Sequence, residues 1–354
     1  MKPNTHFAIH REYLVSLALA ISVRLLMGCG GGSGSSSNQG DTEGSSPSGT
    51  PPSCASGDQG INRCGSAGEG CCSSIWVSGG SYDRTFSSSD AGPAAGSDPT
   101  TVSPFRLDKY EVTVGRFRAF VQAVTGGWTP AVGSGKHAHL NGGQGLADSS
   151  GSAAFEAGWS SLDSISTDAT IWSNSLLACQ LSTWTASAGP NDDLPINCVT
   201  WEQAYAFCIW DDGFLPSEAE WEFAAAGGSE ARPFPWGSMD PGTNSLYADY
   251  GCDVRSDAGT CAIAPVGSAS SGAGKWGHLD LAGNVDEWTL DVDAPYVSPC
   301  TDCAYLSSTT TVDRIIRGGH FTSVGSSSIQ STARNSFTPT DRDMGNGVRC
   351  ARTP

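Results

Sequence analysis

Cysteine content constrains the fold of this chain more than any other feature of its sequence. The 354 residues include 13 cysteines, and all of them except Cys29 fall between positions 54 and 350. An even set of cysteines in an exported chain predicts a framework of disulfides. A cytosolic zinc protein is the alternative, but zinc sites favour paired C-x-x-C motifs, and only Cys300 and Cys303 have that spacing. The sequence therefore favours a disulfide-stapled fold.

The N-terminus resembles a bacterial lipoprotein signal. Lys2 and Arg11 give it a positive start, and residues 13–23 form an apolar run that is too short to span a bilayer. The run leads to LMGC, whose cysteine, Cys29, is the expected site of cleavage and lipid attachment. We expect residues 1–28 to be removed. The lipid on Cys29 would then hold the protein at a membrane of the bacterial cell envelope, in the periplasm or on the outer surface.

Composition divides the rest of the chain into three parts. Residues 29–53 are rich in Gly, Ser, Pro and Thr, which predicts a flexible tether. Residues 75–354 hold the 11 tryptophans and are expected to form the main domain. The segment between them, 54–74, is predicted to form two disulfides, with the pairing left open, among Cys54, Cys64, Cys71 and Cys72. The net charge of −17 argues against nucleic acid as a partner.

Three helix starts are visible in the main domain. Thr113 is a potential N-cap for a helix whose apolar face runs from Val114 to Val124. The other two starts are capping boxes, in which Ser or Thr at the N-cap is followed three residues later by Glu or Gln. They are Thr200 with Gln203 before WEQAYAFCIW, and Ser217 with Glu220 before EAEWEFAAA.

The remaining elements are expected to be short strands and loops. Residues 75–77 and 105–110 have strand-like patterns. Residues 126–190 are rich in Gly, Ser and Thr and show no regular period, so we interpret them as loop. Beyond residue 230 only short apolar runs separated by turns are present. The predicted class is α+β, with few helices and much irregular loop.

Six motifs occur in an order that resembles the sulfatase-modifying-factor domain of formylglycine-generating enzymes. The resemblance covers roughly residues 75–354 and implies a C-type-lectin-like fold with small twisted sheets, two main helices and abundant loop. The motifs are FRLDKYEVTVGRFRAFV (105–121), LPINCVTWEQAYAFCIWDDGFLPSEAEWEFAAAGG (194–228), PFPWG (233–237), GHLDLAGNVDEW (277–288), RIIRGGHF (314–321) and GNGVRC (345–350).

The resemblance also implies a chemistry, which this sequence departs from. Formylglycine-generating enzymes oxidise a cysteine of a partner protein with molecular oxygen, using copper(I) held by two cysteines in the loop after the R-G-G motif. The expected counterparts of those cysteines here are Ser323 and Ser326, and no cysteine lies between Cys303 and Cys350. Copper(I) is soft and requires thiolate, whereas a serine hydroxyl is hard and stays protonated. We therefore do not expect copper as a cofactor.

Three further positions differ from the family pattern. Phe214 stands where the family usually has Arg before Leu-Pro, which would remove an ion pair. Asp286 stands where the family usually has an aromatic residue in the N-x-x-E-W run. His320 follows R-G-G, where the family commonly has a small polar residue.

These features favour a non-catalytic surface protein that binds a peptide, glycan or other ligand in the cleft beside the altered loop. The residues expected to line that cleft are Ser323, Ser326, Arg334 and Asn335, with His320 at its edge. One alternative is an active formylglycine-generating oxidase that acts on a cysteine of a sulfatase-type partner. Another is a different enzyme that has reused the cleft, but a serine hydrolase needs a base and an oxyanion hole, and no G-x-S-x-G elbow is present.

The resemblance implies calcium as a cofactor. The motif DLAGNVDEW would supply side-chain oxygens from Asp280 and Glu287 and main-chain carbonyls from Gly283 and Val285. An Asx-type turn that needs no ion is the alternative. A second, weaker calcium site falls near Asp249, Tyr250, Asp257 and Thr260.

Several pairings and one histidine pair complete the list of expectations. The family resemblance implies a Cys208–Cys350 disulfide, and Cys179–Cys198 and Cys252–Cys261 are plausible local pairs. Cys300 and Cys303 are interpreted as a small structural bridge rather than a redox pair. His137 and His139 in KHAHL could face one metal, but no third ligand is evident, so a solvated loop is the preferred interpretation.

Overall fold

The computed structural model describes residues 49–55, 61–87, 92–93, 98–161, 163–252, 261–307 and 311–354, all within one compact unit. The expected signal, the lipid site Cys29 and Asp257 lie outside the described residues. Among the residues that are described, no helix has the length and apolar character needed to cross a bilayer.

Four α-helices form in the described chain, and the capping residues explain where three of them begin. Helix α1 (Val114–Thr125) starts after Thr113, whose side chain accepts a hydrogen bond from the Arg116 amide. Helices α3 (Trp201–Trp210) and α4 (Glu218–Ala226) both begin with complete capping boxes. The predicted starts of these helices are confirmed. Short 3-10 turns occupy Pro52–Cys54, Asn141–Gly143, Gly228–Glu230 and Ser326–Ile329.

Helix α2 (Ala169–Leu177) corrects the interpretation of residues 126–190 as loop throughout. Its N-cap is Asp168, which accepts hydrogen bonds from the amides of Thr170 and Ile171. The helix buries only two side chains, Trp172 and Leu176. Two apolar positions are too few to show a helical period in the sequence. Trp172 packs edge-on against Phe117 and Phe120 of α1, so tertiary contact stabilises it.

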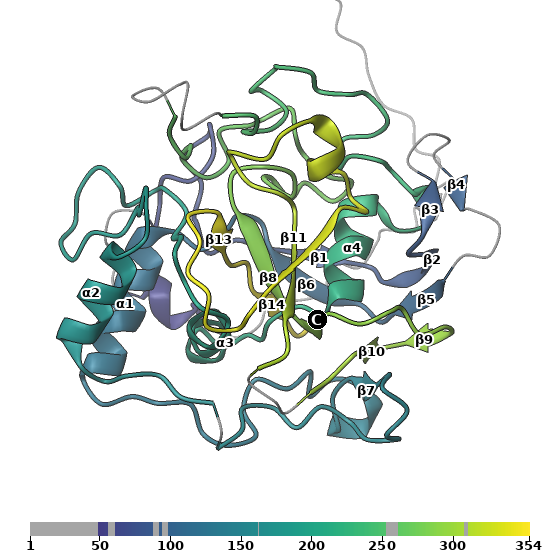
Figure 1. Cartoon of the computed structure of the whole chain (residues 1–354), viewed down its shortest axis with the longest axis horizontal. Helices are drawn as coiled ribbons and strands as arrows, with labels where there is room; N and C mark the ends of the chain where they lie inside the picture. The colour runs from purple at the N-terminus through teal and green to yellow at the C-terminus, as the bar shows by residue number, and fades with distance from the viewer. Residues whose placement is uncertain are drawn as a thin grey trace, which may run out of the picture. The chain divides into compact units, whose positions relative to one another are not determined.

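A four-stranded sheet forms the centre of the fold, in the order β12-β11-β8-β13. Strand β11 (Arg314–Arg317) is antiparallel to both β12 (Arg334–Phe337) and β8 (Asp286–Val292), while β13 (Asn346–Gly347) is parallel to β8. Every residue of β8 and β11 is buried. In Figure 1, α1, α2 and α3 lie to one side of these central strands and α4 lies to the other.

Smaller sheets surround this centre. One three-stranded sheet has the order β1 (Ser74–Val77), β6 (Phe105–Asp108), β14 (Ala351–Arg352). The other has the order β2 (Gly80–Asp83), β5 (Pro99–Val102), β9 (Cys300–Thr301). Two-stranded pairs join β3 (Phe86–Ser87) to β4 (Gly92–Pro93) and β7 (Ala147–Asp148) to β10 (Cys303–Ala304). Few helices and small sheets confirm the predicted α+β class.

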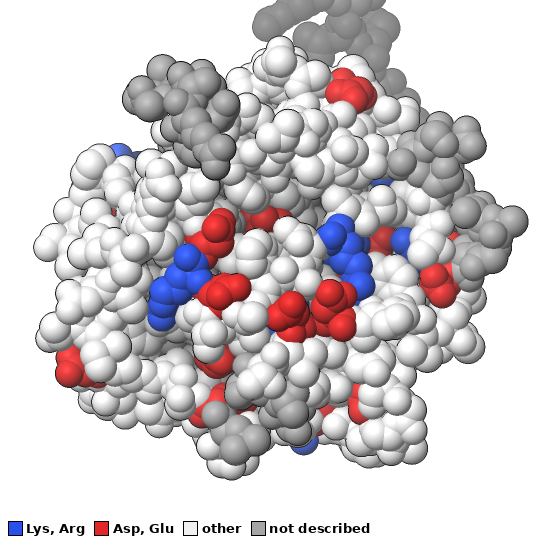
Figure 2. Space-filling model, viewed as in Figure 1, with Lys and Arg blue, Asp and Glu red and all other residues white. Residues whose placement is uncertain are grey.

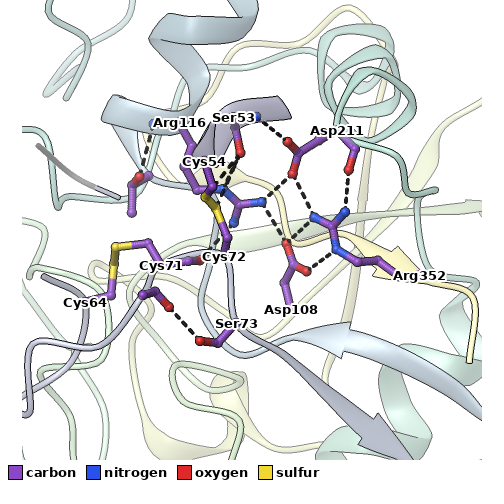
Figure 3. The surroundings of a disulfide bond; sticks show 12 residues. Ser53, Cys54, Cys64, Cys71, Cys72, Ser73, Asp108, Arg116, Asp211 and Arg352 are labelled. Carbon is purple, nitrogen blue, oxygen red and sulfur yellow. Dashed lines mark hydrogen bonds and ion pairs between the residues drawn. A yellow bond between two sulfur atoms is a disulfide. The ribbon is translucent and has the colours of Figure 1, made fainter. Parts of the chain in front are cut away.

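The cysteine-rich segment packs directly against the main domain. Figure 3 shows Cys54–Cys72 and Cys64–Cys71 beside the buried side chain of Arg116. The Arg116 guanidinium donates to Ser53 Oγ at 3.0 Å and to the Cys71 carbonyl at 3.1 Å. A cation on α1 thus organises the segment that precedes the domain.

The same guanidinium belongs to a buried network of four charges. Arg116 and Arg352 both donate to the carboxylates of Asp108 and Asp211, and each guanidinium lies 2.7 Å from Asp211 Oδ2 (Figure 3). All four side chains are almost completely buried. Two positive and two negative charges balance one another, which is the condition for tolerating ions in a protein interior.

The described residues contain six disulfides, and the pairs expected from the sequence are all among them. Beyond the two in the N-terminal segment, they join Cys179 to Cys198, Cys208 to Cys350, Cys252 to Cys261 and Cys300 to Cys303. Cys208 on α3 and Cys350 before β14 are separated by 142 residues, so this bond ties the C-terminal end to the helical core.

Candidate binding pocket

A cavity of about 320 Å³ lies where β8, β11 and β12 meet the loop that follows β11. Its lining combines hydroxyl, amide, imidazole, carboxyl and guanidinium groups with a few small or apolar residues. The lining residues are Asp286, Ile316, Gly319, His320, Ser323, Ser327, Ser328, Ala333, Arg334 and Asn335.

Glycine conformation shapes the loop that forms one wall of the pocket. Gly318 and Gly319 both have positive φ, at 104° and 69°, which turns the chain away from β11. A Cβ on Gly319 would lie 2.6 Å from the Ser328 carbonyl oxygen, so only glycine fits there. The loop is fixed further by the His320 amide, which donates to Ser323 Oγ at 2.9 Å. The backbone conformation and this hydrogen bond together hold the loop in place as one wall of the pocket.

Asp286, the first residue of β8, supplies a buried carboxyl to the pocket. Its side chain is only 5% exposed, and its Oδ1 accepts a hydrogen bond from the Gly319 amide at 2.8 Å. Its Oδ2 lies 3.8 Å from His320 Nε2. Burial raises the pKa of Asp286 to about 8 and, on the other side of the gap, lowers the pKa of His320.

Arg334 brings a cation to the opposite wall, but its charge is already paired. The guanidinium donates from Nε to Glu218 at 2.7 Å and from Nη1 to Asp293 at 3.0 Å. Glu218 also lies near Arg317, at 3.8 Å. The side chain amide nitrogen of the neighbouring Asn335 has no hydrogen-bond partner among the described residues, whereas its Oδ1 accepts from the Ser336 amide.

The structure brings together four of the five expected cleft residues. His320, Ser323, Arg334 and Asn335 line the pocket, but Ser326 does not. Ser326 Oγ instead donates to Asp240 Oδ2 at 2.5 Å, which directs its side chain to another segment. Position along a loop does not determine the direction of each side chain, because the 3-10 turn Ser326–Ile329 reorients the chain there.

Among the polar side chains of the pocket, the sequence analysis did not predict three, Asp286, Ser327 and Ser328. Asp286 carried a usable signal, because it stands where the family usually has an aromatic residue. We noted that difference without expecting it to reach the cleft. Its place becomes evident only from the pairing of β8 with β11, which sets the start of β8 beside the loop.

No thiol is available at the pocket. Its lining contains no cysteine, and each of the 12 cysteines from Cys54 to Cys350 lies in a disulfide. The pocket therefore offers oxygen and nitrogen groups only, which are poor ligands for a soft univalent metal.

The carboxyls expected to bind calcium have other partners. Glu287 accepts from Arg349 at 2.7 Å and from Trp221 Nε1 at 2.6 Å, and Asp280 Oδ2 accepts from the Gly267 amide at 2.5 Å. Asp249 Oδ2 accepts from the Ala264 amide at 3.2 Å. Within the described ranges no group of three or more His, Cys, Asp and Glu is arranged to hold a metal. Calcium binding stays a prediction.

The interpretation of KHAHL as a solvated loop is wrong. His137 is completely buried, and its ring nitrogens lie 2.9 Å from Glu156 and 3.0 Å from Glu220. Phe214, the residue that stands where the family usually has Arg, packs against the His137 ring at 3.9 Å between centroids. Burial alone lowers the pKa of His137, but the two carboxylates outweigh burial and raise it to about 10. The loop thus carries a buried cation.

A second cavity, of about 370 Å³, lies beside Trp201 and Tyr205 of α3. Arg314 lines it, but its guanidinium stacks on the Trp201 ring at 3.9 Å and donates to the carbonyls of Leu290 and Ser307. The Arg314 guanidinium therefore already has partners within the protein, whereas the Asn335 amide nitrogen in the first pocket has none among the described residues. On the face shown in Figure 2, basic side chains form separate groups flanked by acidic ones.

Fold and pocket together define a protein built like the sulfatase-modifying-factor domain, with its own set of polar pocket residues. The sequence profile of the sulfatase-modifying factor enzyme 1-like domain matches residues 65–354. The chain therefore belongs to this family, as its motifs predicted. The match begins inside the cysteine-rich segment, which agrees with the packing of that segment against Arg116.

Individual relatives support the same family. A formylglycine-generating enzyme of Streptomyces coelicolor is 31% identical over 78% of this chain and 88% of its own length. An inactive C-alpha-formylglycine-generating enzyme 2 of Bos taurus is 29% identical over 71% of this chain and 78% of its own. The solved structure of PvdO from Pseudomonas aeruginosa shares the fold, with a TM-score of 0.51 and 22% identity over 79% of this chain and 94% of that one.

Proposed function

We propose that this chain is a non-catalytic member of the family that binds a peptide, glycan or other surface ligand in the pocket between β8, β11 and β12. We further propose that it is exported and anchored to a membrane of the bacterial cell envelope by lipid on Cys29. The observation that supports a binding role is the pocket itself, which combines free polar groups with an absence of thiol.

The family reaction would need a metal that the serines of this pocket do not suit. Copper(I) binds polarisable thiolates, and the alcohol groups of Ser323 and Ser326 cannot replace them. The two hydroxyls also have different surroundings, because Ser323 lines the pocket and Ser326 pairs with Asp240. Neither the chemistry nor the arrangement of these serines matches a two-thiolate site. Hydrogen-bonding groups on a rigid wall do suit reversible recognition.

A formylglycine-generating oxidase is the second candidate. The observation that favours it is the relative of Streptomyces coelicolor, which bears that name and is matched over 88% of its length. The inactive relative of Bos taurus shows that the same fold also occurs without that activity.

One experiment separates the two candidates. The full chain is incubated in air with copper(I) and a cysteine-containing peptide, and oxygen consumption and peptide aldehyde are measured. We expect neither, and turnover above a copper-only control would overturn the proposal.

Peptide and glycan arrays test binding directly, and an absence of binding on both arrays would remove the support for a binding role. Labelling cells with radioactive palmitate tests the anchor, since we expect the label to be lost in Cys29→Ala.

A further inference from the structure

Two titratable side chains from distant segments meet in the pocket. Asp286 is the first residue of β8, and His320 lies in the loop that follows β11. They are far apart in the sequence, yet Asp286 Oδ2 lies 3.8 Å from His320 Nε2. A carboxyl and an imidazole that lie this close in the lining of one cavity point to one shared ligand.

Both atoms are available for hydrogen bonding. Asp286 Oδ1 is used by the Gly319 amide, but Oδ2 has no hydrogen-bond donor among the described residues. His320 Nδ1 lies 3.1 Å from Thr322 Oγ1. When Nδ1 carries the ring proton and donates it to that hydroxyl, Nε2 presents a lone pair to the pocket. When Asp286 is ionised, the pair offers two acceptors that face the same space.

The charge around the pair favours a cationic ligand. Arg334 is the one Lys or Arg that lines the pocket, and Glu218 and Asp293 already neutralise it. Asp286 has no such partner, and burial together with the nearby Asp343 raises its pKa to about 8, so a cation bound beside it would favour the ionised carboxylate and would bind more tightly as pH rises past that value. A ligand carboxylate or phosphate would meet the unpaired Asp286 carboxyl, whereas a ligand cation would supply the missing counter-charge.

We propose that Asp286 and His320 bind a primary ammonium group, such as a lysine side chain or the amino terminus of a peptide. A nitrogen can lie about 2.9 Å from both Oδ2 and Nε2 at once, which uses two of its three donors. Ser323 lines the same pocket and leaves its hydroxyl proton free for the rest of the ligand. This inference rests on the proposed binding function and specifies its ligand class.

A divalent metal fits the pair less well. Histidine and aspartate are common metal ligands, but a stable site needs at least a third protein ligand. Across the ranges that the structure describes, no such group of three exists. An ammonium group needs only the two acceptors and a polar surrounding.

Ligand-observed NMR on the full chain tests the proposal with three probes. They are Nα-acetyl-lysine amide, Nα,Nε-diacetyl-lysine amide and glycinamide, which represent a side-chain ammonium, its neutralised form and an amino terminus. We expect one or both free amines to bind and the diacetyl form not to bind. Asp286→Asn should weaken that binding at least about tenfold, because it removes the counter-charge but keeps an acceptor for the Gly319 amide.

Matched variants make the result decisive. Asp168→Asn changes the net charge equally at the exposed N-cap of α2, where Asn also caps well, and should bind like the wild type. His320→Ser, the family-like residue type, should weaken binding without touching Asp286. Equal binding of the diacetyl probe, or unchanged binding in Asp286→Asn, would overturn the inference. Array hits without any amine binding would overturn it while leaving the proposed function intact.

Discussion

At the scale of single residues, buried charges carry much of the specificity of this fold. Asp211 accepts hydrogen bonds from the Ser53 amide and from the guanidinium groups of Arg116 and Arg352. One carboxylate therefore connects the N-terminal segment, α1 and the last strand (Figure 3). Removing this carboxylate would leave one of the two buried guanidinium charges without a counter-charge, which strongly destabilises a protein interior.

Asp211→Ala should lower the free energy of unfolding by about 3–5 kcal/mol, because it leaves two buried guanidinium groups with a single carboxylate, Asp108. Urea denaturation measures the change. Glu230→Ala is the control, since Glu230 pairs with Arg232 and Lys275 at an exposed site and should cost less than about 1 kcal/mol. Similar losses in the two variants would contradict the assigned role of the network.

At the scale of elements, His137 fastens a long loop to helix α4. Its ring contacts Glu156 within the loop and Glu220, the capping-box residue of α4. Phe214 fills the space beside it, so the position that usually carries Arg in the family is apolar here. A cation reaches Glu220 from a segment far away in the sequence.

This contact predicts a pH dependence of stability. The pKa of His137 is about 10 in the folded state and about 6.5 in an unfolded chain. The stabilisation is therefore complete below about pH 6.5 and is lost as pH rises toward 10. In that window this group lowers the free energy of unfolding by at most about 1.4 kcal/mol per pH unit. Urea denaturation from pH 7 to 10 should show the decline in the wild type and a flatter profile in His137→Gln.

The pocket shows a similar dependence on tertiary contacts. The sequence predicted a cleft beside the loop after R-G-G, and four of the five residues expected to line that cleft do line the cavity. Ser326 does not line the cavity, because a 3-10 turn directs its side chain toward Asp240. Asp286 was missed because nothing local links the start of β8 to that loop.

At the scale of the whole molecule, disulfides tie distant parts of the chain to one core. Cys208 on α3 joins Cys350, 142 residues later, while Cys252 and Cys261 close a separation of only 9 residues. Both bonds lie in the same folded unit. They provide a matched comparison of a long and a short cross-link.

Replacing Cys208 and Cys350 by Ala should cost about 5 kcal/mol in the chain-entropy model, against about 2.6 kcal/mol for Cys252 and Cys261. The larger value follows from the greater freedom that the unfolded chain regains when the longer loop opens. Thermal and urea unfolding of both double variants measure the two costs. A short-loop variant that is as destabilised as the long-loop variant would argue that native packing, not loop closure, sets the order.

The sequence by itself determined the family, the α+β class and the starts of α1, α3 and α4. Helix caps and motif order can be recognised in the sequence alone, because they depend on residues that are close together along the chain. Only the tertiary structure decided that α2 forms, that His137 is buried between two carboxylates, and that Asp286 faces His320. Those features arise from contacts between segments far apart in the chain, where the energy of burial and pairing, not local preference, selects the arrangement.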